Sequence, residues 1–144
     1  MNVALIEKYN VPVPRYTSYP TVPFWTVTDA AEAWGKQLLK AQQAGKFKEG
    51  ISVYIHLPFC ESLCTYCGCN KRITKNHSVE GRYIKALLKE WAMYVAQSPE
   101  KMVLRELHLG GGTPTFFSPE NLKLLLEGIY SSVEIHSEFD ASFE

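Results

Sequence analysis

Four cysteines within ten residues constrain this chain more than any other feature of its sequence. They stand in the run Cys60-Glu61-Ser62-Leu63-Cys64-Thr65-Tyr66-Cys67-Gly68-Cys69. Thiolates are the usual ligands of iron–sulfur clusters, and a loop this short lets three sulfurs hold three corners of one cubane. Such a cradle leaves the fourth iron open to a small molecule, as catalytic zinc sites keep one position open. The spacing therefore predicts that Cys60, Cys64 and Cys67 bind iron.

Two other uses of these thiols are less favourable. Structural zinc sites usually draw two ligand pairs from separated segments, and Cys67 and Cys69 are too close to share one tetrahedral ion comfortably. Disulfides are uncommon in reducing compartments, where clustered cysteines more often hold a metal. Cys69 stays open between a buried small side chain, a thiol that supports the site and a reactive thiol. We carry Cys69 forward as the candidate catalytic residue.

The overall composition excludes several partners. The formal net charge is zero, so no footprint for nucleic acid or an anionic membrane surface is present. Residues 1–10 lack the basic start and apolar run of a signal peptide. No stretch approaches the roughly 18 apolar residues of a membrane span. We therefore expect a cytoplasmic protein with no nucleic-acid and no membrane partner.

Hydrophobic periodicity predicts an α/β fold with a parallel sheet. Apolar and polar residues alternate in 51–57, 103–109 and 138–144, which predicts strands. Helical spacing predicts a helix after a capping Ser78 and another that begins at Ser118-Pro119-Glu120. An earlier helix is expected from a cap at Asp29, with Glu32 completing the capping box, to Gly45. Helices that connect successive strands build a parallel sheet.

The segment before the first helix is predicted to be an extended arm. Four prolines within residues 11–25 remove amide donors and fix the backbone. The arm also carries aromatic side chains that suggest packing against another surface: Tyr16, Tyr19, Phe24 and Trp25.

Three features are expected at one edge of the sheet. In parallel α/β sheets, functional sites lie beyond the carboxyl ends of the strands. The cysteines follow the first predicted strand, Gly110-Gly111-Gly112 follows the second, and Glu144 stands at the end of the third. This convergence predicts one site that includes all three.

Together, these motifs resemble the radical S-adenosylmethionine family. The C-x3-C-x2-C spacing with an aromatic residue, Tyr66, before the last cysteine is similar to that family's cluster motif, and Gly110-Gly111-Gly112-Thr113-Pro114 to its glycine motif. The run from Tyr54 to Asn70 and the arm from Arg15 to Thr21 resemble the oxygen-independent coproporphyrinogen III oxidase branch. A haem-chaperone branch shares the cysteines, but it typically has Cys-Asp-Phe where this chain has Cys67-Gly68-Cys69, and it lacks the arm.

The resemblance implies an oxidoreductase of porphyrin and haem biosynthesis. A reduced 4Fe-4S cluster would donate an electron to S-adenosyl-L-methionine and release methionine and a 5′-deoxyadenosyl radical. The radical would take a hydrogen from a propionate of coproporphyrinogen III, and loss of carbon dioxide and one electron would leave a vinyl group. Two rounds would give protoporphyrinogen IX. Alternatives that the sequence leaves open are a haem chaperone, another radical-SAM enzyme and a non-catalytic zinc or iron module.

By the same resemblance, several residues are expected to bind the cofactor. Tyr54, Gly111 and Glu144 match contacts to a first S-adenosyl-L-methionine, and Tyr66, Gly112 and Thr113 match positions near a second. Taken alone, Tyr54 and His56 could be ordinary strand residues, the glycines a tight turn and Glu144 a solvated end. His77 and His136 are interpreted as plain surface residues, and Arg15 as a carboxylate ligand or a surface ion-pair partner.

The predicted organisation is an arm and helix over residues 1–49, then the first three strands and two helices of a partial (β/α) barrel over 50–144. Three strands do not close such a barrel. We therefore expect a truncated chain that is inactive alone, whose substrate contacts lie partly beyond residue 144. A reducing donor such as flavodoxin or ferredoxin and a monomeric state are expected. The sequence does not identify the final electron acceptor.

Overall fold

The fold is taken from a computed structural model that describes residues 3–10, 24–26 and 30–144. The chain divides into two compact units, Met1–Ala33 and Trp34–Glu144. In the first unit, helix α1 (Val3–Tyr9) has no buried residue. Phe24 and Trp25 of the predicted arm are exposed, whereas residues 11–23 and Asp29 lie outside the described residues. The predicted division at residue 50 stays a prediction.

The second unit contains a parallel three-stranded sheet, as the alternation predicted. Strand β1 (Ile51–Leu57) and strand β5 (Glu134–Phe143) both pair with the central strand β4 (Val103–Gly111) in the order β1-β4-β5. The register places Tyr54 opposite His108, and His108 opposite Ser142. A register shift between Leu104 and Glu106 lets Leu104 be buried as well as Leu107 and Leu109. All three strands therefore end at one edge.

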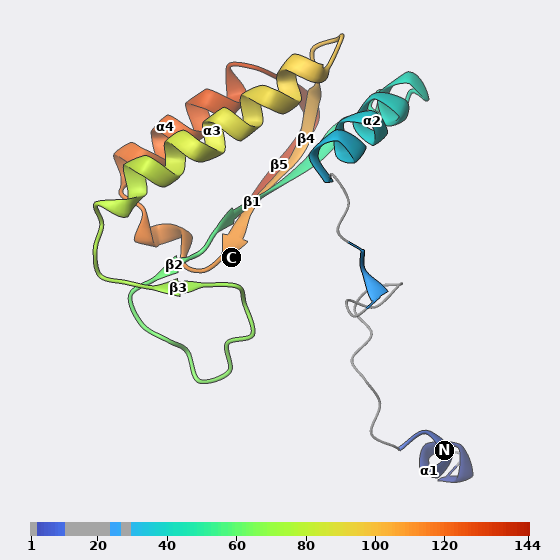
Figure 1. The fold of residues 1–144 in the computed structure, drawn as a ribbon, viewed down its shortest axis with the longest axis vertical. Helices are drawn as coiled ribbons and strands as arrows, with labels where there is room; N and C mark the ends of the chain where they lie inside the picture. The colour runs from blue at the N-terminus through green and yellow to red at the C-terminus, as the bar shows by residue number, and fades with distance from the viewer. Residues whose placement is uncertain (1–2, 11–23, 27–29) are drawn as a thin grey trace. The chain divides into compact units, whose positions relative to one another are not determined.

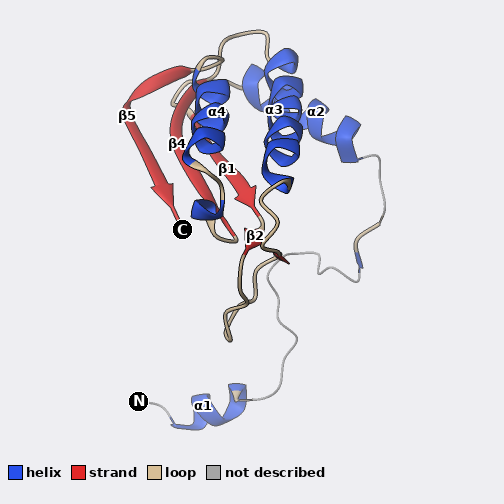
Figure 2. Cartoon of the chain, turned by 90° about the vertical axis from the view of Figure 1, so that its left-hand side faces the viewer, coloured by secondary structure: helices blue, strands red, loops and turns tan. Residues whose placement is uncertain are grey.

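Helices α3 (Val79–Gln97) and α4 (Pro119–Tyr130) lie side by side on one face of this sheet (Figure 1, Figure 2). The core between sheet and helices is apolar and includes Leu57, Leu104, Ile84, Leu125 and Ile129. At its border, Trp91 Nε1 donates a hydrogen bond to Ser132 Oγ at 2.7 Å. The opposite face of β1 and β4 carries polar side chains. The helices thus leave one face of the sheet for a site.

Helix α2 (Ala30–Gln43) ends as the sequence predicted, because Gly45 adopts a φ of +73° just beyond it. Ser118 also caps α4 as predicted, and its Oγ accepts from the Asn121 backbone N–H at 3.2 Å. The prediction for Ser78 is wrong in its detail. The Ser78 side chain makes no capping bond, and the Ser78 N–H instead donates to Asn76 Oδ1.

A second, smaller sheet was not predicted. Strand β2 (Phe59–Cys60) pairs with strand β3 (Arg72–Ile73) in parallel, so that the cysteine loop begins and ends side by side. A short 3-10 helix, η2 (Pro114–Phe116), follows the glycines and precedes α4. Within the described part of the chain, the helices are too short or too polar to cross a membrane.

Candidate functional site

The cysteine loop leaves the sheet edge at the end of β1. Its base is held by backbone bonds, from Arg72 N–H to Pro58 O at 2.7 Å and from Thr74 N–H to Cys60 O at 2.9 Å. Cys60 and Cys67 are half-buried, whereas Cys64 and Cys69 are exposed, and all four thiols are free. The loop therefore presents unpaired thiols from a fixed base.

The thiols differ in their surroundings. Thr113 Oγ1 donates to Cys60 Sγ at 3.4 Å, which connects the glycine segment to the first cysteine. The Cys69 backbone amide holds the pKa of the Cys67 thiol below its ordinary value, although partial burial opposes this, and Lys71 adds to the lowering. The neighbouring charge of Cys67 raises the pKa of Cys69. Because metals bind the thiolate, these surroundings favour Cys67 as a ligand over Cys69.

The structure does not gather the predicted ligands into a finished site. Among the described residues, no three histidine, cysteine or carboxylate side chains are placed to hold a metal ion together. The donor set nevertheless fits an iron–sulfur cluster, because Cys60, Cys64 and Cys67 are free thiols on one short loop. Apart from Cys67, residues 61–70 are exposed. Loop side chains outside the core can turn without breaking core packing.

On the polar face of the sheet, three rings lie together. Tyr54 and His108 stack with ring centroids 5.5 Å apart. The Tyr54 hydroxyl lies 3.1 Å from His56 Nδ1, and His56 Nε2 donates to Asn70 O at 2.7 Å, because a carbonyl oxygen only accepts. His56 therefore holds the far end of the cysteine loop against the sheet.

His108 extends this group to the third strand. Its Nδ1 lies 2.7 Å from Ser142 Oγ, and its Nε2 lies 3.5 Å from Glu144 Oε2. The Glu144 backbone N–H donates to Leu109 O at 3.0 Å, so this residue is held at the sheet edge although its side chain is 85% exposed. The sequence reasoning did not single out His108. In the sequence, its signal is that it alternates with the buried Leu107 and Leu109, which places it on the polar face of the strand.

The glycine run is required by packing on both sides. A Cβ at Gly110 would lie 2.9 Å from His108 Nε2, and one at Gly111, whose φ is +107°, would meet the His56 ring. A Cβ at Gly112 would lie 2.7 Å from Leu57 O. Gly112 N–H donates to that same oxygen at 2.8 Å. These glycines let the end of β4 contact the ring cluster and the start of the cysteine loop.

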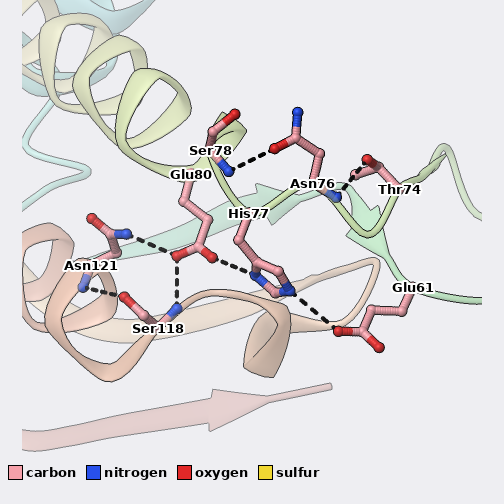
Figure 3. Close-up of polar contacts among 8 residues, drawn as sticks. All are labelled: Glu61, Thr74, Asn76, His77, Ser78, Glu80, Ser118 and Asn121. Atoms are coloured by element: carbon pink, nitrogen blue, oxygen red, sulfur yellow. Dashed lines mark hydrogen bonds and ion pairs between the residues drawn. The ribbon is translucent and has the colours of Figure 1, made fainter.

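His77 is more than the plain surface residue that the sequence suggested. Its Nδ1 lies 2.7 Å from Glu80 Oε1 and its Nε2 lies 3.2 Å from Glu61 Oε1 (Figure 3). The ring also stacks on Phe116 at a centroid distance of 4.3 Å. Hydrogen bonds to Glu80 and then Glu61 raise the pKa of His77 above its ordinary value, against a smaller opposing effect of burial.

The remaining predicted site residues are placed less closely. Tyr66 is 90% exposed at the tip of the loop. Thr113 N–H donates to Phe59 O at 3.0 Å, which fixes the segment after the glycines.

A cavity of about 830 Å³ lies along β1, between α2 and α3, and is lined largely by apolar side chains such as Leu38, Phe47 and Leu87. This cavity reaches Tyr54 and His56 but includes none of the cysteines.

We predict that Gly112→Ala lowers the free energy of unfolding of the chain by about 1–3 kcal/mol, the usual cost of overpacking. The added methyl group would meet backbone atoms of Leu57 and Pro58, which cannot turn away. The matched control is Gly68→Ala, where an added Cβ has no heavy atom within 4 Å. Urea unfolding of both variants under reducing conditions measures the difference. Equal midpoints would contradict the packing role.

We also predict a pH-dependent contribution from His77. Because folding raises the pKa of His77 above 6.5, its bonds stabilise the fold fully below pH 6.5, and this is lost as the pH rises through the folded value. Burial would raise the pKa of Glu80, but bonds from Ser118, Asn121 and His77 lower it below 4.5, so its contribution is lost in acid.

The difference in thermal midpoint between wild type and His77→Gln should therefore be largest between pH 4.5 and pH 6.5, the ordinary pKa values of Glu80 and His77. It should shrink as the pH rises above 6.5. His136→Gln is the control, because His136 Nδ1 accepts a bond from the Glu138 backbone N–H. A difference that grows steadily with pH would overturn the assignment.

Comparisons with known proteins agree with this geometry. The chain is 36% identical over 133 residues to the oxygen-independent coproporphyrinogen III oxidase of Pseudomonas aeruginosa, covering 91% of this chain and 28% of that protein. It is 34% identical over 143 residues to the Escherichia coli protein of the same name, covering 99% of this chain and 30% of the other. No protein-family model matches the chain.

The fold leads to the same relatives. A solved structure of coproporphyrinogen III oxidase from Escherichia coli, described as a radical SAM enzyme, matches with a TM-score of 0.74 and 28% identity. The match covers 99% of this chain and 30% of that one. The chain thus spans about 30% of the length of its relatives. By sequence and by fold, the chain is similar to about 30% of the length of oxygen-independent coproporphyrinogen III oxidases, one of which is described as a radical SAM enzyme.

Proposed function

We propose that this chain is the cluster-binding part of an oxygen-independent coproporphyrinogen III oxidase, acting in haem biosynthesis in the cytoplasm. One observation carries the proposal: the cysteine loop, the glycine run and the Tyr54–His108–Glu144 group meet at one edge of the sheet. Sites in parallel α/β folds lie at that edge. The names of the relatives supply the substrate, coproporphyrinogen III, and the motif resemblance implies the reaction, which would convert its propionate side chains to vinyl groups with loss of carbon dioxide.

In this proposal, Cys60, Cys64 and Cys67 hold a 4Fe-4S cluster through their thiolates. When bound with S-adenosyl-L-methionine, such a cluster supplies the one-electron chemistry that begins hydrogen removal from a substrate side chain. The chain's own part is to bind and orient these groups and to exclude water. The lowered pKa of Cys67 supports its role as a ligand, whereas the raised pKa of Cys69 leaves less of its thiol ionised.

The polar face of the sheet would receive S-adenosyl-L-methionine. The Glu144 carboxylate is exposed and can accept hydrogen bonds from an amine or from hydroxyl groups of a ligand. Tyr54 stacks on the His108 ring, whose Nε2 lies 3.5 Å from Glu144 Oε2, and Gly111 is half-buried against the His56 ring. We infer that His108 holds Tyr54 and Glu144 in position.

A second S-adenosyl-L-methionine molecule would lie nearer the loop, where Tyr66, Gly112 and Thr113 stand. The exposed Tyr66 ring is free to stack on a ligand. Residues 50–144 would form the first part of the barrel and residues 1–49 a separate arm and helix. A small reducing protein, flavodoxin or ferredoxin, would supply the electron.

The first experiment tests the ligands on the chain itself. After anaerobic reconstitution with iron and sulfide, the chain should show broad absorbance at about 400 nm, which iron–sulfur clusters give. Serine at Cys60, Cys64 or Cys67 should remove most of the bound iron and of this absorbance. Cys69→Ser is the matched control and should keep both. Equal iron loss in all four variants would contradict the three-cysteine assignment, and zinc bound without iron would support a structural metal site.

The second experiment tests the reaction. The chain should replace the matching segment of the Escherichia coli relative, to which it is 34% identical. The chimera, with S-adenosyl-L-methionine and a reductant, should convert coproporphyrinogen III to protoporphyrinogen IX, and its Cys60→Ser version should not. A chimera that binds the cluster and cleaves S-adenosyl-L-methionine but leaves the substrate unchanged would contradict the proposed substrate. Haem binding by that chimera would favour the chaperone alternative.

A further inference from the structure

Glu80 lies in the first turn of α3. Among the described residues it is the one charged residue that is buried, with 2% of its surface exposed. Its Oε2 accepts hydrogen bonds from the Ser118 backbone N–H and from Asn121 Nδ2, both at 2.8 Å (Figure 3). These donors belong to the N-terminal end of α4. Loss of these partners would leave a buried charge unpaired, which strongly destabilises a protein. Glu80 is therefore held in place where α3 meets α4.

His77 joins this fixed carboxylate to the cysteine loop. Its Nδ1 lies 2.7 Å from Glu80 Oε1, and its Nε2 lies 3.2 Å from Glu61 Oε1. Ionised carboxylates only accept hydrogen bonds, so both ring nitrogens donate when His77 is the imidazolium ion. The ring plane is set by stacking on Phe116 at 4.3 Å, with an interplanar angle of 12°.

Glu61 is the residue directly after Cys60, at the point where the loop leaves its base. Beyond the base, most of residues 61–70 are exposed, so few contacts set the direction of the loop. At the far end, His56 Nε2 holds Asn70 O. At the near end, Glu61 contacts His77, which lies 16 residues later in the chain. One histidine therefore holds each end of the loop.

We propose that His77 is a positioning residue that clamps the first turn of the cysteine loop, through Glu61, to the buried Glu80 and so sets the place of Cys60. The importance of this for catalysis rests on the function proposed above, whereas the clamp itself belongs to the chain without its cluster. His77 touches none of the reacting groups in this proposal. It acts through Glu61 and the backbone of the loop.

The test measures how fast iodoacetamide alkylates each cysteine of the reduced, cluster-free chain, by mass spectrometry of its peptides. Glu61→Ala and His77→Phe should each raise the Cys60 rate by about two- to five-fold, the range for loss of one exposed ion pair. Phenylalanine keeps the stack on Phe116. Glu61→Gln keeps an acceptor oxygen and should restore most of the wild-type rate. His136→Gln is the control and should leave the rate unchanged.

Charge alone does not give this pattern. Removing the Glu61 carboxylate favours a nearby thiolate, whereas removing the His77 cation disfavours it, so a purely electrostatic effect would move the two variants in opposite directions. A clamp raises the Cys60 rate in both single variants. The double variant should add little to either one, because both substitutions break the same His77–Glu61 contact. The Cys69 rate serves as the internal reference, since a general loss of stability would raise it as well.

Unchanged Cys60 rates, opposite shifts in the two variants or equal acceleration at Cys69 would overturn the proposal. If His77→Phe fails to fold, the comparison of Glu61→Ala with Glu61→Gln decides, because Glu61 is 59% exposed in its side chain. After reconstitution, both clamp variants should also lose iron to a chelator faster than wild type. A clamp pattern in a chain that binds no iron would refute the proposed function and leave the clamp standing.

Discussion

The parallel pairing of β1 with β4 is the constraint on which the rest of the structure depends. It places Tyr54 opposite His108 and Leu57 opposite Gly111, so the polar face and the start of the cysteine loop are set by one register. A slip of one residue would turn the polar side chains toward the helices and the aliphatic ones toward solvent. The core under α3 and α4, with Leu57, Leu104 and Leu109 almost fully buried, opposes such a slip.

The glycine run connects this register to the site. Protein atoms fill the space that side chains would need at these glycines. The His108 and His56 rings fill it at Gly110 and Gly111, and the backbone of Leu57 to Phe59 fills it at Gly112. The resemblance implied that Gly111 and Gly112 lie close to a cofactor. The structure adds that they first bring two protein segments close. Gly112 is thus a packing requirement even before any cofactor binds.

What could be predicted from sequence is what depends on near neighbours. The strand at 51–57, the α4 start at Ser118 and the helix end at Gly45 follow from alternation, a cap and a glycine, all local signals. Ser78 failed because its backbone is already helical, with φ −63° and ψ −13°, whereas a capping residue is normally extended. The two-residue strands β2 and β3 are too short for periodicity to reveal. The contacts of His77 with Glu61 and Phe116, and of His108 with Tyr54 and Ser142, join residues 16 to 54 apart, and such pairs follow from the fold alone.

The site combines a rigid frame with an exposed loop, and the frame has an energetic cost. A buried carboxylate such as Glu80 costs free energy, which three hydrogen bonds from Ser118, Asn121 and His77 offset. An apolar residue at position 80 would fill the same space without that cost, but it would leave the ends of α3 and α4 unconnected and His77 without its fixed partner. The cysteines themselves need freedom to turn toward a metal cluster. A frame that holds the loop at its two ends, through His77 and His56, leaves that freedom to the residues between them.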